Sequence, residues 1–431
     1  MSEGNRIRRT ILALIAISQV FSPVLFVPGT ENFGGSVFRL ILIVVSVALI
    51  LSTGFTLVGE WARRALIAGS VLTAWMTISL TWSPELLSGL QEVSYVITIL
   101  VLIYVIEVLI RDEQDLLSLG RWIVVLGGLI TVASYYEWGT GHHFFHSSLQ
   151  DIAETNRSLS YISDNLAWFT FDNPNDLTVH LAMCFFIAVP LLWGSKAGKA
   201  ALFLFFVALA YLSDQLDARI VSASLVVFVI LYAVARVQRT PFHNYATAMA
   251  MIGVILVGLV LALKYINSTE LLDESTFIRL QLVKIGFILG SHTLFLGIGS
   301  GSFETELWSG GYLGETYGII NPHNAFSRMF AENGILGLMA LGYLVIGPIL
   351  VLPRATRVSA LTAFTAAASI GLVSLFSVGS NPLSSSSLQL AIAYLWVACR
   401  FMTNSDVAAH KSVASPINKG ARDFEIRNSV R

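Results

Sequence analysis

The densest group of polar residues in this sequence is the segment 321–337, "NPHNAFSRMFAENGILG". It gathers His323, Asn324, Arg328 and Glu332 at the start of a long apolar run. A histidine side chain titrates close to neutral pH, so it is suited to take a proton from a reacting hydroxyl. Arginine presents a planar fork of donors that fits phosphate oxygens. The segment therefore has residue types for general-base chemistry beside an anionic group.

Helix periodicity separates these residues onto two faces. Asn321 followed by Pro322 predicts a helix start, with asparagine as the cap and proline in the first turn. A helix from there places His323 and Ser327 on one face, four residues apart. His323 and Glu332 then point to nearly opposite sides, so a direct dyad is disfavoured unless the helix breaks at "ENGILG".

The second face of that helix carries Asn324, Arg328 and Glu332 at spacings of four residues. We interpret Arg328 and Glu332 as a structural ion pair that neutralises both charges at the membrane edge. Asn324 is predicted to contact substrate.

A second cluster, "SDQLDARIVSAS", places Arg219 at the start of a predicted span. An arginine at membrane depth costs several kcal/mol unless it is paired or hydrated. Asp214 and Asp217 are near enough in sequence to pair with it, which predicts a neutral cap on a short hairpin. The alternative is an anion site in which Arg219 binds a diphosphate.

A third cluster, "STFIRLQLVKIGFILGSHTLFLGIGSGSF", carries Arg279 and Lys284. Five residues correspond to about 140° around a helix, so one cation can face a cavity while the other reaches solvent or headgroups. The "GIGSGSF" stretch lacks the strand and Lys-Ser/Thr of a nucleotide-binding loop, so it predicts a tight turn that brings backbone close to the cavity. His292 is predicted to be interfacial.

A fourth cluster, "FTFDNPNDLTVHLAM", crowds Asn173, Asn175 and Asp176 at the start of a span. Helix capping accounts for such residues. The amides of Asn173 and Asn175 are also candidates to bind sugar hydroxyls. The preceding "GHHFFHSS" has no carboxylate or cysteine at a metal-ligand spacing, so it predicts a flexible loop.

Composition sets the fold that must position these clusters. Of the 431 residues, 55% are hydrophobic and 12% are charged, about half the charged fraction of a soluble domain. Long apolar runs predict an all-α polytopic membrane protein of about twelve transmembrane helices. The predicted spans are 10–27, 37–57, 65–80, 93–110, 122–136, 175–193, 198–212, 220–235, 246–266, 335–351, 358–376 and 387–402. The charged stretch 277–295 predicts an interfacial or re-entrant helix instead.

Most of the 26 lysines and arginines fall on one side of these spans. The positive-inside rule therefore predicts cytoplasmic termini. Residues 1–403 form one transmembrane catalytic domain, and 404–431 form a disordered cytoplasmic tail. Two long outside segments, about 137–174 and 267–334, are rich in aromatic residues that suit either stacking on sugars or an interfacial belt.

The net charge of −1 gives no indication of a nucleic-acid partner. Both cysteines lie in apolar runs, so no disulfide framework or thiolate metal site is expected.

The clusters, in their order along the chain, resemble the O-antigen ligase and polysaccharide polymerase superfamily of bacterial inner membranes. Within it they resemble the succinoglycan-type exopolysaccharide polymerases. The matching pieces cover nearly the whole chain except the tail, and the last two are the most specific. They are "WSPELLSGL", "NPNDLTVHLAM", the hairpin with Arg219, the stretch from Arg279 through "GSHTLFLGIGSGSF", and "HNAFSRMFAENGILG". One departure is Ala218, where the family often has serine before the hairpin arginine.

The resemblance implies a GT-C-type glycosyltransferase that acts on a saccharide carried by undecaprenyl diphosphate. An acceptor hydroxyl attacks the anomeric carbon and the lipid diphosphate leaves, with inversion and without a metal or other cofactor. Carried over by position, Arg219 and Arg279 hold the diphosphate and His323 takes or orients the acceptor proton. Lys284 joins the predicted substrate-binding residues. A chain-length regulator and export machinery are expected partners, and the active site is expected to face the periplasm.

Two alternatives remain open. A ligase that transfers finished polysaccharide to another acceptor would share the same catalytic residues. A lipid-saccharide or solute transporter would also fit twelve spans, but it predicts ionisable or broken-helix sites near the bilayer midplane. The charges here cluster at the outer ends of the predicted spans, which favours chemistry at the surface.

Overall fold

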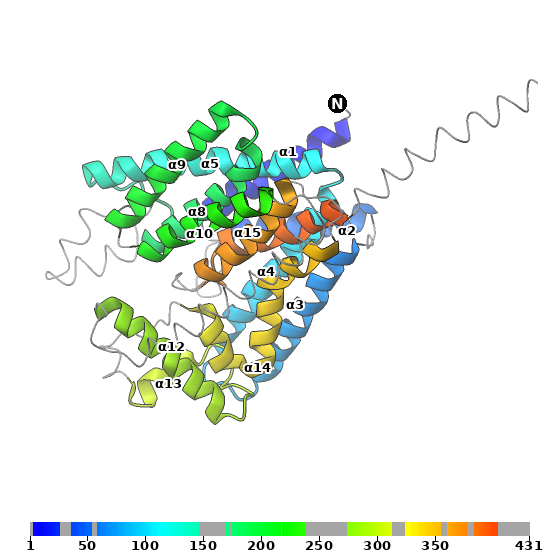
Figure 1. Ribbon diagram of the computed structural model, residues 1–431. Coiled ribbons are helices and arrows are strands. Elements are labelled where there is room, and N and C mark those ends of the chain that lie inside the picture. Colours follow the sequence, from blue (N-terminus) through cyan, green and yellow to red (C-terminus); the bar gives the residue numbers. More distant parts are fainter. Residues whose placement is uncertain are drawn as a thin grey trace, which may run out of the picture.

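The computed structural model describes residues 3–25, 36–53, 58–145, 167, 169–171, 174–216, 218–237, 274–312, 324–354, 360–376 and 383–403. Over these ranges the regular structure is entirely helical (Figure 1). The predicted span 246–266 and the tail 404–431 lie outside the described residues.

The first part of the chain folds into long helices with short connections. These are α1 (Glu3–Val20), α2 (Val37–Thr53), α3 (Glu60–Ser79), α4 (Leu86–Leu109) and α5 (Glu113–Thr140). Local sequence signals fix some of their ends. Asp112 caps α5 by accepting a hydrogen bond from the Asp115 amide at 2.8 Å, as expected for an N-cap residue. Gly141 ends α5 with a left-handed φ of 68°, a conformation that glycine adopts at little cost.

The second part contributes the helices that carry the predicted site. They are α8 (Pro174–Leu192), α9 (Lys196–Gln215), α10 (Arg219–Val237), α12 (Glu274–His292), α13 (Phe303–Ser309), α14 (Ala325–Ile346), the 3-10 helix η5 (Gly347–Arg354), α15 (Ala360–Leu375) and a last helix at 386–403.

The predicted fold class is confirmed: the protein is an all-α polytopic membrane protein. Five helices of the described chain are long and apolar enough to cross a bilayer, at Leu86–Leu109, Glu113–Thr140, Pro174–Leu192, Lys196–Gln215 and Ala325–Leu352. Each predicted span other than 246–266 coincides with a helix. α12, which was expected not to span, is not among the five. Nor are some helices at predicted spans, among them α1, α2, α3, α10 and α15.

The helices pack in two neighbouring groups (Figure 1). In one, α3 lies between α4 and α14, and α2 packs on α4. In the other, α8 contacts α5, α9 and α15, while α10 packs along α15. Small residues permit close approach: a Cβ on Gly127 of α5 would lie 2.6 Å from the Cβ of Cys184 on α8. Close contact at small residues is typical of helix pairs in membranes.

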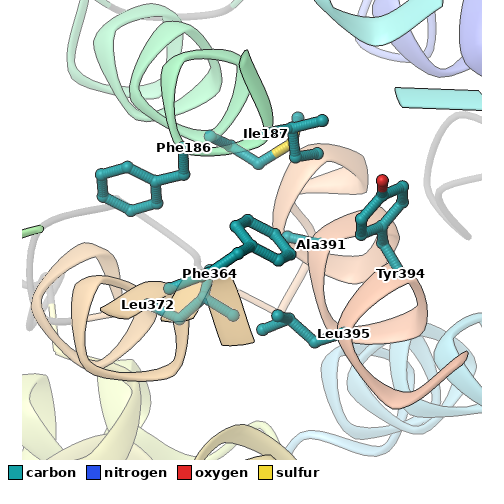
Figure 2. Close-up of a pocket in the computed structure, with 9 residues that line it drawn as sticks. Phe186, Ile187, Phe364, Leu372, Ala391, Tyr394 and Leu395 are labelled. Atoms are coloured by element: carbon teal, nitrogen blue, oxygen red, sulfur yellow. The ribbon is translucent and has the colours of Figure 1, made fainter. Parts of the chain in front are cut away.

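A pocket between α8, α15 and the last helix is apolar (Figure 2). Its lining includes Phe186, Phe364 and Leu395. The only side-chain hydroxyl in the lining belongs to Tyr394, which donates to the backbone oxygen of Leu116 at 3.4 Å. This pocket therefore has no free polar group with which to bind a saccharide or a diphosphate.

α12 and α13 lie together at one end of the bundle, beside α14 (Figure 1). We call this the α12 end. It contains the third sequence cluster and the described part of the 321–337 segment, so Arg279 and Arg328 both lie on helices of this end.

Candidate active site at the end of the helix bundle

α14 begins at Ala325, and Asn324 is its N-cap. The Asn324 side-chain oxygen accepts hydrogen bonds from the amides of Phe326 at 3.1 Å and Ser327 at 3.0 Å. The predicted start with Asn321 as cap is therefore wrong, because the second asparagine supplies the cap. His323 precedes Asn324 in the sequence and lies outside the described residues, so its predicted position on one face with Ser327 stays a prediction.

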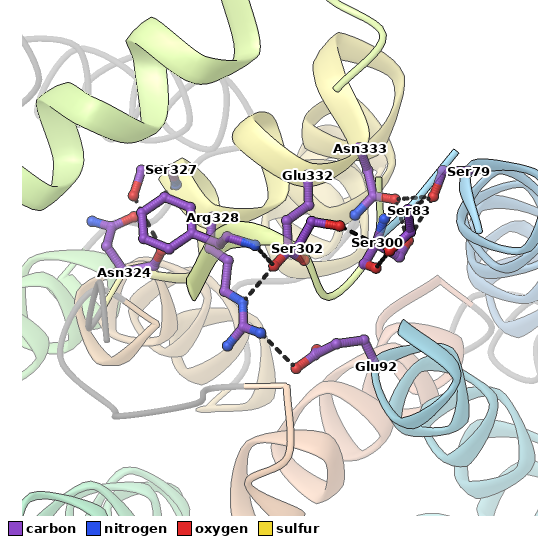
Figure 3. A network of polar contacts seen from close by, with 11 residues as sticks. Ser79, Ser83, Glu92, Ser300, Ser302, Asn324, Ser327, Arg328, Glu332 and Asn333 are labelled. Atoms are coloured by element: carbon purple, nitrogen blue, oxygen red, sulfur yellow. Dashed lines mark hydrogen bonds and ion pairs between the residues drawn. The ribbon is translucent and has the colours of Figure 1, made fainter. Parts of the chain in front are cut away.

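Arg328 is the polar centre of the α12 end (Figure 3). Its Nε lies 3.1 Å from Oε1 of Glu332, and its Nη2 lies 3.2 Å from Oε1 of Glu92 on α4. All three residues are buried. The predicted partner of Arg328 is thus present, and a second carboxylate from a distant helix joins it. Buried charges are stable only when they are paired in this way.

Glu332 also connects α14 to the first residue of α13. Its Oε1 accepts a hydrogen bond from the Phe303 amide at 3.2 Å. On the other side of Glu92, the Arg39 guanidinium of α2 lies 4.5 Å from the ring centroid of Tyr95 and donates to Ser94 at 3.4 Å. Charged groups of α2, α4 and α14 therefore meet at this end of the bundle.

α14 breaks at Gly334, where φ is 63° and ψ is −158°. The sequence allowed a break at "ENGILG", and the structure has one there. In an unbroken helix the Ile335 amide would bond to Ala331, but here it donates to the oxygen of Phe295 at 2.9 Å. The carbonyls of Ala331 and Glu332 accept instead from the amides of Ile298 and Gly299, both at 2.9 Å. The break is thus satisfied by another segment, as membrane-embedded backbone requires.

The segment that satisfies the break is the glycine-rich stretch 297–303. Gly297, Gly299 and Gly301 all have positive φ values, of 92°, 107° and 76°. A Cβ on Gly301 would lie 2.3 Å from the amide nitrogen of Gly89, in the "WSPELLSGL" piece. The predicted role, a tight turn that allows close backbone approach, is confirmed. Three pieces of the family resemblance are therefore in direct contact.

Serine hydroxyls form hydrogen bonds across this contact (Figure 3). The side-chain oxygen of Asn333 accepts from Ser300 at 2.7 Å and from Ser79 at 3.1 Å. Ser83 donates to the backbone oxygen of Ser300 at 2.8 Å, and its hydroxyl lies 2.8 Å from that of Ser302. This arrangement satisfies nearly all the polar atoms of the turn.

Substituting Gly334 with alanine should disrupt the α12 end. The new Cβ would lie 1.8 Å from the oxygen of Phe295, and the positive φ is unfavourable for alanine. We expect a lower thermal unfolding midpoint in detergent and loss of activity. Gly342→Ala is the matched control on the same helix, because nothing lies within 4 Å of its Cβ position. Equal midpoints for the two variants would show that the break is not needed.

Arg279 lies on α12, which packs against α14. A Cβ on Gly286 would lie 3.0 Å from the oxygen of Ser327, and one on Gly290 would lie 2.7 Å from that of Phe330. Arg279 precedes Gly286 by seven residues, about two turns, so it shares the face of α12 that meets α14. It is half-buried, whereas Lys284 is exposed. The two cations therefore differ in exposure, and Lys284 is the one that reaches the surface.

The other predicted residues lie farther along the chain. Arg219 begins α10 directly after the α9–α10 turn, where the Ala218 amide donates to the oxygen of Ser213 at 2.7 Å. The Arg219 side chain and Asp217 are outside the described part, as is Asn173. Asn175 lies in the first turn of α8, and no described donor reaches its buried Oδ1.

Glu137 anchors the described start of "GHHFFHSS", the stretch that the sequence predicted to be a flexible loop. Its carboxylate accepts from the amides of Phe144 at 2.9 Å and Phe169 at 2.8 Å. His143 Nδ1 lies 3.9 Å from the same carboxylate. Residues 142–145 are thus tied to α5, which corrects the flexible-loop prediction for this part of it.

The sequence did not single out Glu92, Asn333 or the serines that contact it. Glu92 had a usable signal, since a carboxylate beside a predicted span is unfavourable unless it has a partner. The serines had none, because isolated serines are common in membrane helices and only the fold brings them together. Over the described residues, no group of three or more histidine, cysteine, aspartate or glutamate side chains is placed to hold a metal ion.

Comparison with known proteins gives one match. Residues 181–342 match a family model described as O-Antigen ligase, and no curated protein matches the chain. The matched range starts in α8 and ends in α14, so it includes the positions of Arg219, Arg279 and His323. Members of this family are membrane ligases and polymerases of the glycosyltransferase type. This match over residues 181–342 supports the resemblance of the chain to the O-antigen ligase and polysaccharide polymerase superfamily.

Proposed function

We propose that the protein is a bacterial inner-membrane polysaccharide polymerase. It joins oligosaccharide repeat units carried by undecaprenyl diphosphate into exopolysaccharide, of the succinoglycan type, or O-antigen chains. The observation that carries this proposal is the O-antigen ligase match over residues 181–342. This range includes both α12 and the start of α14, which pack against each other at the α12 end.

In the proposed reaction, a hydroxyl of the acceptor saccharide attacks the anomeric carbon of the donor chain. The bond from that carbon to the lipid diphosphate breaks, and the configuration inverts. His323 takes or orients the proton of the attacking hydroxyl. The capped start of α14 supports this role, since His323 directly precedes Asn324 and is therefore within one residue of a rigid helix end.

The leaving diphosphate gains negative charge as the bond breaks. Arg279 and Arg219 stabilise that charge, as prepositioned donors do at other anionic transition states. Two arginines supply the positive charge for which other glycosyltransferases use a divalent cation, so the proposed reaction needs no metal or other cofactor. The location of Arg279 on the α14-facing side of α12 supports this assignment.

Four further residues are proposed to bind substrate. The open acceptor of Asn175 and the amide of Asn173 are suited to sugar hydroxyls. Asn324 uses its side-chain oxygen for capping, so its amide nitrogen is the atom offered to substrate. Lys284, exposed on α12, would contact the anionic headgroup of the lipid carrier. We further propose that the termini are cytoplasmic, that the α12 end faces the periplasm, and that a chain-length regulator and export machinery act with the protein.

A ligase is the second candidate within the family, because it would use the same residues. The description of the matched family, O-Antigen ligase, is the observation that favours it. A lipid-saccharide transporter is less well supported. Partly buried ion pairs join Arg9 to Asp115 at 3.2 Å and Arg400 to Glu107 at 2.8 Å. These lie near helix ends, as Arg328 does, whereas a transporter is expected to place charge at the midplane.

Glycan analysis of a deletion strain separates the candidates. A polymerase predicts that secreted or surface polymer is lost and that single repeat units accumulate on the lipid carrier in the periplasmic leaflet. A ligase predicts polymer of normal length that is no longer attached to its acceptor. Lipid-linked repeats confined to the cytoplasmic leaflet would contradict both and indicate a transporter.

A further inference from the structure

The turn that follows α12 exposes three consecutive apolar side chains. Leu294 is 84% exposed, and Phe295 and Leu296 are each 53% exposed. We call these three residues the apolar tip. Single exposed apolar residues are ordinary on any surface, but contiguous apolar patches mark contacts with another molecule or a membrane.

The backbone holds the apolar tip outward at a cost. Leu294 and Phe295 have φ values of 53° and 65°, a left-handed conformation that is unfavourable for bulky side chains. Local hydrogen bonds maintain it. The Phe295 amide donates to the oxygen of Gly290 at 3.2 Å, and the Gly297 amide donates to the Thr293 hydroxyl at 2.9 Å. The exposure is therefore built into the turn.

The apolar tip is continuous with the apolar surface of the spanning helices. Its Phe295 oxygen bonds to the amide of Ile335, the first residue of the predicted span 335–351. Ile335 is 46% exposed and Met339, one turn further, is 65% exposed. Both belong to the part of α14 that is long and apolar enough to cross a bilayer. Trp82, in the turn between α3 and α4, is 40% exposed and extends the same surface. Its indole nitrogen donates to the Gly297 oxygen at 3.2 Å.

We propose that the apolar tip inserts into the bilayer leaflet that surrounds the α14 break, with lipid acyl chains as its partner. We infer lipid, and not another protein, as the partner because the tip is continuous with the exposed apolar surface of α14. Ser291 and His292, both exposed just before the tip, would lie at headgroup level. Membrane insertion anchors α12 at its C-terminal end. Arg279, thirteen residues before His292, then lies at most about 20 Å along the helix from the membrane edge.

Spin labels on single introduced cysteines test this insertion in the full-length protein. Leu294→Cys and Leu296→Cys carry the label at the apolar tip. Met339→Cys is the reference for a lipid-facing position, and Lys284→Cys is the reference for an aqueous one. Both native cysteines are buried, so label on the unsubstituted protein measures the background. The proteins are reconstituted in vesicles of phosphatidylcholine and phosphatidylglycerol, and collisions with oxygen and with a water-soluble nickel chelate are compared by power saturation.

At positions 294 and 296 we expect collisions with oxygen to exceed those with the nickel chelate, as at 339, and the reverse at 284. Nickel accessibility at the tip equal to that at 284 would place it in water and overturn the proposal. Low accessibility to both reagents would indicate a protein contact, either a partner or a second copy, and would overturn it equally. If one tip variant fails to fold, as judged by gel filtration, the other gives the same readout.

Discussion

Replacing Arg279 with alanine should reduce polymer formation by a factor of about 10² to 10³, the effect of removing one donor from a charge-stabilising site. Arg279 lies on the face of α12 that meets α14 and is half-buried, so its loss removes positive charge from the proposed diphosphate site. In cells, single repeat units should accumulate on the lipid carrier while the amount of protein in the membrane stays normal. Gel analysis of extracted polymer and of lipid-linked intermediates measures both.

His292→Ala is the matched control for Arg279→Ala. It removes another basic side chain from α12, at the exposed end of that helix, and should leave polymer unchanged. Arg279→Lys retains the charge but not the planar fork, and we expect intermediate activity. Normal polymer from Arg279→Ala would exclude Arg279 from the reaction.

The second large effect is expected on stability, at Arg328. Alanine at this position leaves two buried carboxylates, Glu92 and Glu332, without their shared partner. Breaking a buried ion pair by removing one member costs about 3–5 kcal/mol. We therefore expect a low yield of folded protein and a much lower thermal unfolding midpoint in detergent.

Arg64→Ala provides the comparison, because Arg64 pairs with Glu60 at the same four-residue spacing but on an exposed surface. Exposed pairs of this kind contribute about 0.5 kcal/mol or less. Restoring neutrality in a triple variant, Arg328→Met with Glu92→Gln and Glu332→Gln, should recover part of the lost stability. If Arg328→Ala and Arg64→Ala unfolded at the same temperature, the buried junction would contribute nothing.

The sequence was sufficient for features that depend on local composition and spacing. Long apolar runs predicted the all-α membrane fold, and the four-residue spacing predicted the partner of Arg328. The break at Gly334 was also predictable, because Asn-Gly before an apolar run favours the end of a helix. The helix start was not. Asn321 and Asn324 are equally good caps by residue type. The helix starts after Asn324, where the Ala325 amide also donates a hydrogen bond to the Phe376 oxygen at 2.9 Å, a tertiary contact that the local sequence does not show.

The contacts that assemble the α12 end join residues far apart in the chain, and the sequence does not specify them. Glu92 and Arg328 are far apart in the sequence. Ser79 and Ser300 are also far apart, separated by 221 positions. Periodicity assigns each residue to a face of its own helix, but not to a partner helix. The two glycines Gly89 and Gly301 illustrate this limit, since their contact allows the turn to approach α4 and neither glycine is unusual in its own segment.

The central claim is that His323 acts in a glycosyl transfer that requires no metal. Its most direct test is elongation by purified protein, supplied with lipid-linked repeat units in a buffer containing EDTA. The unsubstituted protein should form chains of several repeats and release undecaprenyl diphosphate, whereas His323→Ala, with a normal gel-filtration profile, should form none. Elongation by His323→Ala at the normal rate, or elongation by the unsubstituted protein only after a divalent metal replaces EDTA, would contradict the claim.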